Sequence, residues 1–184
     1  MYVLTQVIPI RMKDCYIRGM NKINSELRQQ AIALGLCEQW QGEWKNTWKP
    51  EELVERFFRG INFCVKNHYP DKDFLTKNFD KKFLRNNNIV VDDEYSLLNP
   101  QQALITGASK SNIRFNGLSS GRIHIQGDSS VKLNAKNRSN VIAHIWDNAQ
   151  IEIQIEDMAN VLVIRHSKEA LVIANDNIPV KDRF

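Results

Sequence analysis

The chain has few cysteines, and their spacing excludes the two structures that cysteines most often build. Only three occur among the 184 residues, at Cys15, Cys37 and Cys64. An odd number at wide spacing does not form a disulfide framework, and no two lie close enough in sequence for a zinc knuckle. Thiols stay reduced in the cytoplasm, so we expect the protein to work there.

Long hydrophobic runs are absent as well. A membrane helix needs about 20 consecutive apolar residues, and no segment approaches that length. The N-terminal segment MYVLTQVIPIRMKD contains an apolar stretch, but no basic residue precedes it and no small-residue cleavage site follows it. We therefore expect neither contact with a membrane nor a signal peptide.

The net charge is small, at +4. Hydrophobic residues make up 42% of the chain and charged residues 25%, which is ordinary usage for a globular protein. A mildly basic chain can contact nucleic acid or another acidic partner but does not have to. The balance excludes a mimic of DNA, which needs a strongly acidic surface.

The first half of the sequence has the apolar spacing of α-helices. In PEELVERFFRGINFCVKN (50–67), apolar residues recur at steps of three and four, which predicts one helix. An earlier helix is predicted from Asn21 to about Leu36. The segment DKDFLTKNFDKKFLR (71–85) is less regular, and it is either one helix or two short helices broken near Asp80.

From Gln101 onward the period changes to tens. One column of the repeat supplies turn residues, namely Gly107, Gly117, Gly127, Asn137, Asp147 and Asp157. A second column is small, with Ser109, Ser119, Ser129, Ser139, Ala149 and Ala159. A third is apolar, with Ala103, Ile113, Ile123, Leu133, Ala143, Ile153, Val163 and Ile173. Alternating apolar residues followed by turn residues indicate a short half-buried strand and a tight turn, repeated.

A fixed period indicates a stacked repeat, because one repeat cannot bury its apolar face alone. We predict two decapeptides per coil, so that residues 20 apart stack at the sheet spacing of about 4.8 Å. One inward ladder would then contain Ile113, Leu133, Ile153 and Ile173. The other would contain Ile123, Ala143 and Val163. An antiparallel sandwich is the alternative, but its hairpins would not need turn residues in one constant register.

The predicted fold class is therefore α+β. An α-helical region covers residues 1–99, and a parallel β-helix-like β-solenoid of ten-residue repeats covers 100–184, ending in a short tail. We expect the helices to cap the first coil. At the far end, Pro179 and the charged residues after it would blunt the sheet edge. Alternatively, two copies form a homodimer through that end.

Four segments carry a resemblance to a known family. They are GLCEQWQGEW, RGINFCVKNHYP, FDKKFLRNNNIVVDD and the decapeptide array with DNA at 147–149. With them, most of the chain resembles a family of uncharacterised proteins common in bacterial phages, prophages and other mobile elements. The resemblance implies a genetic context and a layout of helices followed by a solenoid, and it implies no activity.

Two sets of residues are candidates for contact with a partner. The first is the series Trp40, Trp44 and Trp48, since exposed tryptophans often dominate binding surfaces. The alternative is that these rings wedge the helices together. The second set is basic and lies in one stretch of the solenoid, where it would form a face for a phosphate backbone. It contains Arg114, Arg122, Lys132, Lys136 and Arg138. The alternative is a solvated surface, and the next stretch of the array is acidic.

The sequence predicts no metal site, no cofactor and no enzyme. His124 and His144 are 20 apart and should stack outward on one sheet, but a metal site needs three or four ligands. No phosphate-binding glycine loop, zinc-protease motif or nucleophile elbow occurs. Solenoid acyltransferases use a catalytic histidine, but their six-residue period is missing. The run from Asp92 to Glu94 is more typical of a solvated turn than of a magnesium site.

These observations favour a non-enzymatic binding protein. The resemblance sharpens this hypothesis to a phage or mobile-element accessory factor that inhibits a host protein or ribonucleoprotein, such as a CRISPR defence effector (an anti-CRISPR protein). The alternative is an RNA-binding or DNA-binding protein that uses the basic stretch.

Overall fold

The computed structural model describes residues 10–175 and 177–184, with side chains from residue 19 onward. The chain divides into two compact units between Pro70 and Asp71. This differs from the predicted boundary after residue 99. Two short helices and two strands that precede residue 99 belong to the same unit as the solenoid.

The first unit is helical, as predicted. It contains α1 (Ile10–Ala33), α2 (Glu38–Glu43), α3 (Pro50–Arg59) and α4 (Ile61–Lys66). The predicted helix over 50–67 is interrupted at Gly60, whose poor helix propensity suits a break. The core of this unit is made of buried apolar residues, among them Leu27, Ala31, Leu53, Ile61 and Val65.

The second unit begins with two short helices, α5 (Lys72–Asn78) and α6 (Lys81–Asn86). The Asp71 carboxylate caps α5 by accepting a hydrogen bond from the Phe74 backbone N–H at 2.7 Å. Asp80 caps α6 in the same way through Phe83 at 2.8 Å. The break near Asp80 is thus confirmed, because an aspartate that caps a new helix cannot also continue the previous one.

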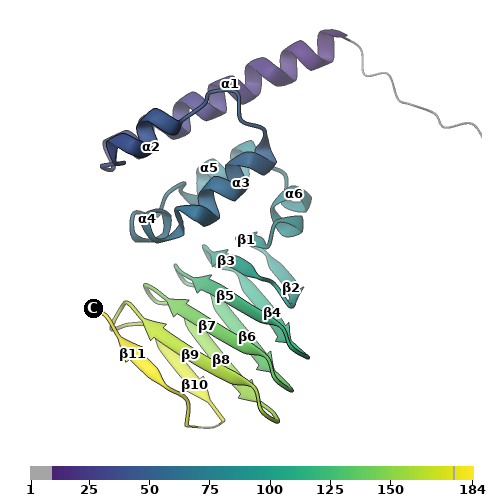
Figure 1. Cartoon of the computed structure of the whole chain (residues 1–184), viewed down its shortest axis with the longest axis vertical. Coiled ribbons are helices and arrows are strands. Elements are labelled where there is room, and N and C mark those ends of the chain that lie inside the picture. Colours follow the sequence, from purple (N-terminus) through teal and green to yellow (C-terminus); the bar gives the residue numbers. More distant parts are fainter. Residues whose placement is uncertain (1–9, 176) are drawn as a thin grey trace, which may run out of the picture. The chain divides into compact units, whose positions relative to one another are not determined.

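The rest of the second unit is a β-solenoid of two parallel sheets (Figure 1). Sheet A contains β1 (Ile89–Val91), β3 (Gln102–Thr106), β5 (Ser120–Ile125), β7 (Asn140–Ile145), β9 (Asn160–Arg165) and β11 (Val180–Asp182). Sheet B contains β2 (Glu94–Leu98), β4 (Lys110–Phe115), β6 (Ser130–Ala135), β8 (Gln150–Ile155) and β10 (Leu171–Ala174). Successive strands alternate between the sheets, so one coil contains two decapeptides, as predicted.

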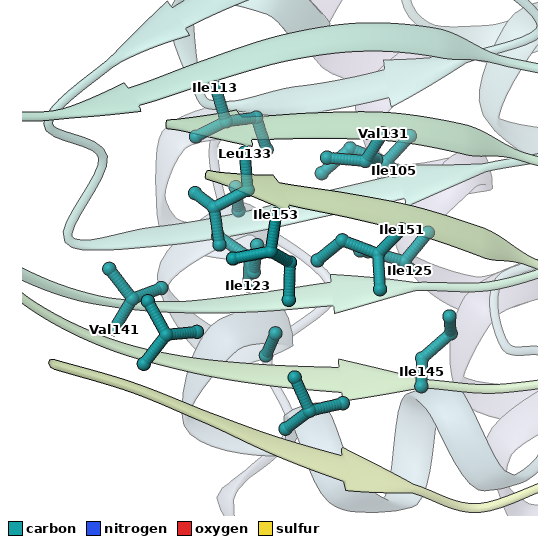
Figure 2. Packing of buried hydrophobic residues seen from close by; sticks show 14 of the residues in the cluster. Ile105, Ile113, Ile123, Ile125, Val131, Leu133, Val141, Ile145, Ile151 and Ile153 are labelled. Atoms are coloured by element: carbon teal, nitrogen blue, oxygen red, sulfur yellow. The ribbon is translucent and has the colours of Figure 1, made fainter. Parts of the chain in front are cut away.

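The inward ladders fill the space between the sheets (Figure 2). Ile113, Leu133 and Ile153 are register partners on neighbouring strands of sheet B. Ile123, Ala143 and Val163 are register partners on neighbouring strands of sheet A. All six are at most 1% exposed. This arrangement confirms the predicted ladders over the central coils, and burial of these side chains is the main stabilising contribution of the solenoid.

The turns owe their shape to a backbone conformation that few residues adopt. The column of turn residues from Gly107 to Asp157 has φ between 54° and 75° throughout. Glycine, asparagine and aspartate tolerate this left-handed region best, which explains their restriction to this column. The carboxylate of Asp147 also accepts a hydrogen bond from the Gly127 backbone N–H of the preceding coil at 2.8 Å.

The first coil is shorter than the others, and the repeat of ten residues did not predict it. Ile89 pairs with Leu104, fifteen residues later, whereas Gln102 pairs with Arg122, twenty residues later. Residues 89–98 therefore form strands and not part of a helical region, so the prediction for this segment was wrong. The residues of a coil with a different length do not fall into the columns of the ten-residue repeat. The repeat pattern therefore cannot reveal such a coil.

The step to the last strand of sheet B is longer by one residue. Leu171 pairs with Gln150, twenty-one residues earlier, so Val172 faces inward and Ile173 faces outward. The predicted place of Ile173 in the inward ladder was wrong, and its side chain is 54% exposed. The physical reason is the alternation of a β-strand, in which a shift of one residue turns every side chain to the opposite face.

We expect Gly121→Ala to destabilise the solenoid by about 1–3 kcal/mol through overpacking. A Cβ atom at Gly121 would lie 2.2 Å from the Pro100 carbonyl oxygen and 2.5 Å from the Phe115 ring. Gly117→Asn is the control, because nothing lies within 4 Å of that position and Asn137 occupies the same column. Urea unfolding followed by circular dichroism measures both variants. Equal stability of the two would contradict this account of the packing.

Candidate functional site

The two outer faces of the solenoid differ in chemistry. The outward side chains on the central strands of sheet B, here called outer face B, are polar, with Asn112, Arg114, Lys132, Asn134, Glu152 and Gln154. The first and last strands of this sheet add the exposed apolar residues Leu98 and Ile173. The outward side chains of sheet A, called outer face A, are mostly apolar or aromatic. They include Leu104, His124, Ile142, His144, Trp146, Leu162, Ile164 and His166. Outer face B therefore resembles an ordinary solvated surface, and outer face A does not.

The structure does not bring the predicted basic set together. Arg114 and Lys132 lie on outer face B, and Arg122 lies on outer face A. Lys136 and Arg138 lie in the turn between β6 and β7. Residues ten apart in sequence belong to opposite sheets, so a stretch that is basic in sequence does not make one basic face.

Stacking of the coils also pairs two of these cations with acids. Lys132 Nζ lies 3.4 Å from Glu152 Oε2, and Lys136 Nζ lies 2.7 Å from Glu156 Oε2. The hydrogen bond from Lys136 lowers the pKa of the Glu156 carboxyl. Each pair joins residues 20 apart, so the stacking of the coils places two acids of the acidic stretch beside two cations of the basic stretch. Such exposed pairs add little stability, but they reduce the positive potential that a phosphate backbone would meet.

Arg122 differs from Lys132 and Lys136 in two respects. Its side chain is exposed, and no ion pair joins it to an acid in the part of the chain that the structure describes. It also lines a groove of about 800 Å³ on outer face A. We call this the Arg122 groove; it is lined by Gln102, Arg122, Asn140, Ile142, Leu162 and Pro179, among others. Its chemistry is one cation beside amide groups and half-buried aliphatic side chains.

A stack of aromatic rings lies beside this groove on outer face A. His124 stacks on His144 with ring centroids 4.6 Å apart, as predicted from their spacing. His166 stacks on Trp146 at 3.7 Å and is hydrogen-bonded to His144, with Nε2 of His166 3.0 Å from Nδ1 of His144. His166 and Trp146 were not predicted to join this stack, although both fall in the outward column next to His144.

The stacked histidines are held in their neutral form. Burial lowers the pKa of His124 to about 3, and the nearby His144 and Arg122 act in the same direction. Burial lowers the pKa of His144 to about 4, with contributions from His166 and Arg122. The hydrogen bond between His144 and His166 also requires at least one of the two rings to be neutral, since one ring nitrogen must accept.

His124 is the most enclosed member of the stack. Its side chain is 1% exposed, and neither ring nitrogen has a hydrogen-bond partner in the described part of the chain. Leu104 precedes it in the same outward column of sheet A. An imidazole without partners in such a position is destabilising relative to a well-packed apolar side chain.

The tryptophan series lies in the helical unit. Trp48 is 4% exposed, and its carbonyl accepts a hydrogen bond from the Asn24 side chain at 2.9 Å. Trp44 is half-buried and packs on Trp48 with ring centroids 5.0 Å apart. Trp40 is half-buried beneath the Arg59 guanidinium. Trp48 is therefore a buried packing residue of the helical unit, as the alternative interpretation of the tryptophan series predicted, and it is not an exposed anchor.

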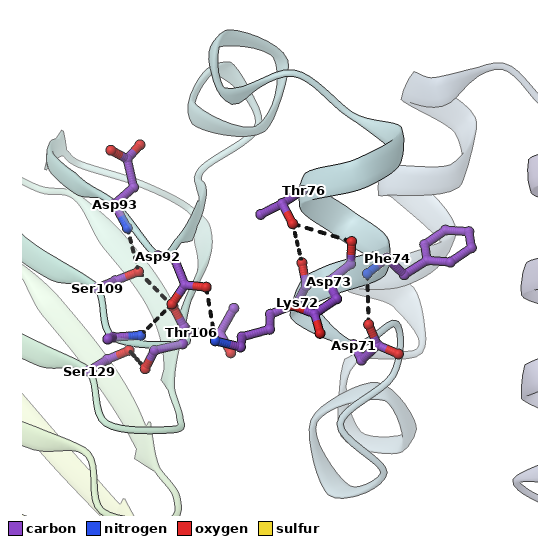
Figure 3. Close-up of polar contacts among 12 residues, drawn as sticks. Asp71, Lys72, Asp73, Phe74, Thr76, Asp92, Asp93, Thr106, Ser109 and Ser129 are labelled. Atoms are coloured by element: carbon purple, nitrogen blue, oxygen red, sulfur yellow. Dashed lines mark hydrogen bonds and ion pairs between the residues drawn. The ribbon is translucent and has the colours of Figure 1, made fainter.

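The acidic run joins the first coil to Lys72 of α5 (Figure 3) and to Arg85 of α6. Asp92 accepts hydrogen bonds from the Ala108 backbone N–H at 2.8 Å and from Lys72 Nζ at 3.1 Å, which lower its pKa. Asp93 accepts two hydrogen bonds from Arg85, at 2.7 and 2.8 Å. These carboxylates are engaged within the fold. Among the described residues, no group of three or more histidine, cysteine, aspartate or glutamate side chains is placed to hold a metal ion.

The apolar character of outer face A is visible in the sequence of its strands. The strands of sheet B alternate strictly, as in SVKLNA, whereas β7 and β9 contain the unbroken apolar runs VIA and VLVI. An unbroken run in a strand indicates apolar side chains on both faces. The sequence therefore indicated that the outer face of sheet A is more apolar than the outer face of sheet B.

Comparisons with protein-family models, with curated proteins and with solved structures each found no match. In the described residues, no helix is both long enough and apolar enough to cross a membrane.

We expect the stability of the solenoid to fall as the pH drops below 6.5. Above that pH, the imidazoles are neutral in the folded and the unfolded chain. Below it, the unfolded chain binds protons that folded His124 and His144 do not bind until about pH 3 and 4. The loss reaches at most about 1.4 kcal/mol per pH unit for each histidine.

His124→Leu is the variant that tests this expectation. It should flatten the dependence of the free energy of unfolding on pH between 6.5 and 4, and it should not destabilise the protein at pH 7. Gln126→Met is the control, because it changes a buried neighbour in the next outward column without removing a titrating group. An unchanged pH slope in His124→Leu would contradict the assignment. Urea titrations at each pH provide the measurement.

Proposed function

We propose that the protein is a non-enzymatic binding protein that engages a protein partner through outer face A and the Arg122 groove. The observation that carries this proposal is the difference between the two faces. Outer face B is polar over its central strands and pairs Lys132 with Glu152, whereas outer face A offers the Arg122 cation beside aliphatic and aromatic side chains.

A solenoid face suits binding because it is rigid before the partner arrives. Its side chains stand on strands that are hydrogen-bonded to neighbours on both sides, from β3 to β9. The indole of Trp146 and the imidazole of His166 are held in one stack. Little side-chain freedom is then lost on association, and this raises affinity for a given contact area.

The chemistry of the groove defines the partner segment. Ile142 and Leu162 are half-buried and can cover apolar side chains, while Arg122 can receive a carboxylate. The expected partner segment is therefore apolar with an aspartate, a glutamate or a C-terminal carboxylate placed to reach Arg122. Outside that contact, the amides of Gln102 and Asn140 offer hydrogen bonds at the rim.

The family resemblance supplies the context of this proposal. A phage or mobile-element accessory factor in the cytoplasm would bind a host protein or ribonucleoprotein, such as a CRISPR effector, and inhibit it. Direct binding of RNA or DNA is the second candidate. It rests on the net charge of +4 and on Arg114 and Arg138, which have no ion pair with other described residues.

A matched pair of charge reversals separates the two candidates. Arg122→Glu alters outer face A, and Arg114→Glu makes the same change on outer face B. The tagged full chain and both variants are used to capture partners from native host lysate, with and without nuclease treatment. Cross-linking with mass spectrometry then identifies the partner segment.

On the proposed function, a stoichiometric protein survives nuclease and cross-links to outer face A through an apolar segment that contains a carboxylate. Arg122→Glu weakens its affinity roughly 30-fold or more, the factor expected when one partner of a desolvated charge pair is lost, and Arg114→Glu leaves it unchanged. Equal loss in both variants, together with loss on nuclease treatment, would favour nucleic acid. Capture insensitive to Arg122→Glu would contradict the proposal.

A further inference from the structure

The last coil of the solenoid ends in two open sheet edges. β10 is the final strand of sheet B, and β11 is the final strand of sheet A. Within the described residues of this unit, no element pairs with the free side of either strand. At the opposite end of sheet A, β1 packs against α6 and α5. The unit is therefore covered at its first coil and bare at its last.

The interior of the solenoid is exposed at this bare end. In the coil before it, the inward side chains Val161 and Val163 are at most 3% exposed. In the last coil, Val172 and Ala174 face inward but are only half-buried. Three further apolar side chains of this coil, Leu171, Ile173 and Val180, are exposed. A partly exposed core layer with an apolar border favours burial against another surface.

The backbone of β10 is free to form another sheet ladder. The N–H groups of Leu171 and Asn175 donate to carbonyls on the β8 side at 3.0 and 3.2 Å. Because alternate residues of a strand point their polar groups to opposite sides, those of Val172 and Ala174 face the open edge. The sequence of β10, LVIA, contains no charge or proline to discourage pairing.

Pro179 does not protect the other edge, contrary to the expectation from the sequence. Its carbonyl accepts a hydrogen bond from the Val163 N–H at 3.0 Å, so the polar side of Pro179 faces β9 and not the open edge. The Asp182 carboxylate is also engaged, because Arg165 donates to it at 2.8 and 3.0 Å. Two cations, Lys181 and Arg183, have no ion pair with described residues.

We propose that this end binds a second copy of the chain, with β10 of one copy pairing antiparallel with β10 of the other about a twofold axis. Val172 of each copy then lies opposite Ala174 of the other, so the open-edge N–H and C=O groups of both strands are satisfied. Ile173 lies opposite its own copy on the outer face. The two half-exposed core layers become one continuous core across the interface.

The occupant is a second copy because the β10 edge is complementary to itself. It presents donors and acceptors at the same spacing, which is what an interface with twofold symmetry requires. The free cations Lys181 and Arg183 would repel their copies and attract an acidic partner. Dimerisation should therefore strengthen with added salt, whereas binding of an acidic foreign protein at this end should weaken.

Light scattering during size exclusion tests the proposal on the full chain. The wild type should have twice the chain mass of 21.3 kDa. Ile173→Lys should be monomeric, because it places two like charges opposite one another at the axis. The matched control is Leu118→Lys in the turn between β4 and β5, where an 82% exposed leucine lies away from this end. This control should remain dimeric.

Ala174→Pro is the second variant. It removes an N–H that faces the open edge and leaves the hydrogen bonds from Leu171 and Asn175 to the β8 side in place. This variant should also be monomeric, and its Tm should equal that of the wild type at concentrations where the wild type is monomeric. A wild type that stays monomeric at about 100 µM, where an interface of micromolar Kd is populated, would overturn the proposal. So would a dimer that persists in both variants, or one that dissociates as salt is added.

Discussion

The solenoid depends on one constraint, which is that each central coil contains an even number of residues. Strands alternate their side chains with a period of two, so a coil of 20 residues returns every side chain to the face it had one coil earlier. The inward ladders, the column of left-handed turn residues and the stacking of Lys132 on Glu152 all follow from this number. The even coil length thus determines most of the contacts between coils in the second unit.

The same constraint decides how much of the fold could be predicted. Seven repeats with turn residues in one register were enough to predict the strands, the two sheets and the ladders of the central coils. The first and last coils were misjudged because their lengths differ, as the pairing of Ile89 with Leu104 and of Leu171 with Gln150 shows. A helix-to-strand boundary at residue 89 leaves no periodic signal, since three residues of β1 are too few to show alternation.

The candidate site was less predictable than the fold, although its parts were visible. The cations between 110 and 138 were grouped by sequence distance, whereas contact in a solenoid follows steps of 20. Applying that step would have paired Lys136 with Glu156 and left Arg122 without an acid. The enclosure of His124 could not be predicted, because it depends on tertiary packing around an outward side chain and not on the repeat.

The even coil length also restricts how such an array can change in evolution. Insertion of one residue within a strand would turn the rest of that strand inside out, whereas a turn can absorb an extra residue, as the step of twenty-one residues from Gln150 to Leu171 shows. Duplication of a whole coil would lengthen both faces and leave every contact type intact. Duplication of a single decapeptide would keep the core inside but move each later strand to the other sheet, so that the polar and apolar outer faces would exchange places halfway along the molecule.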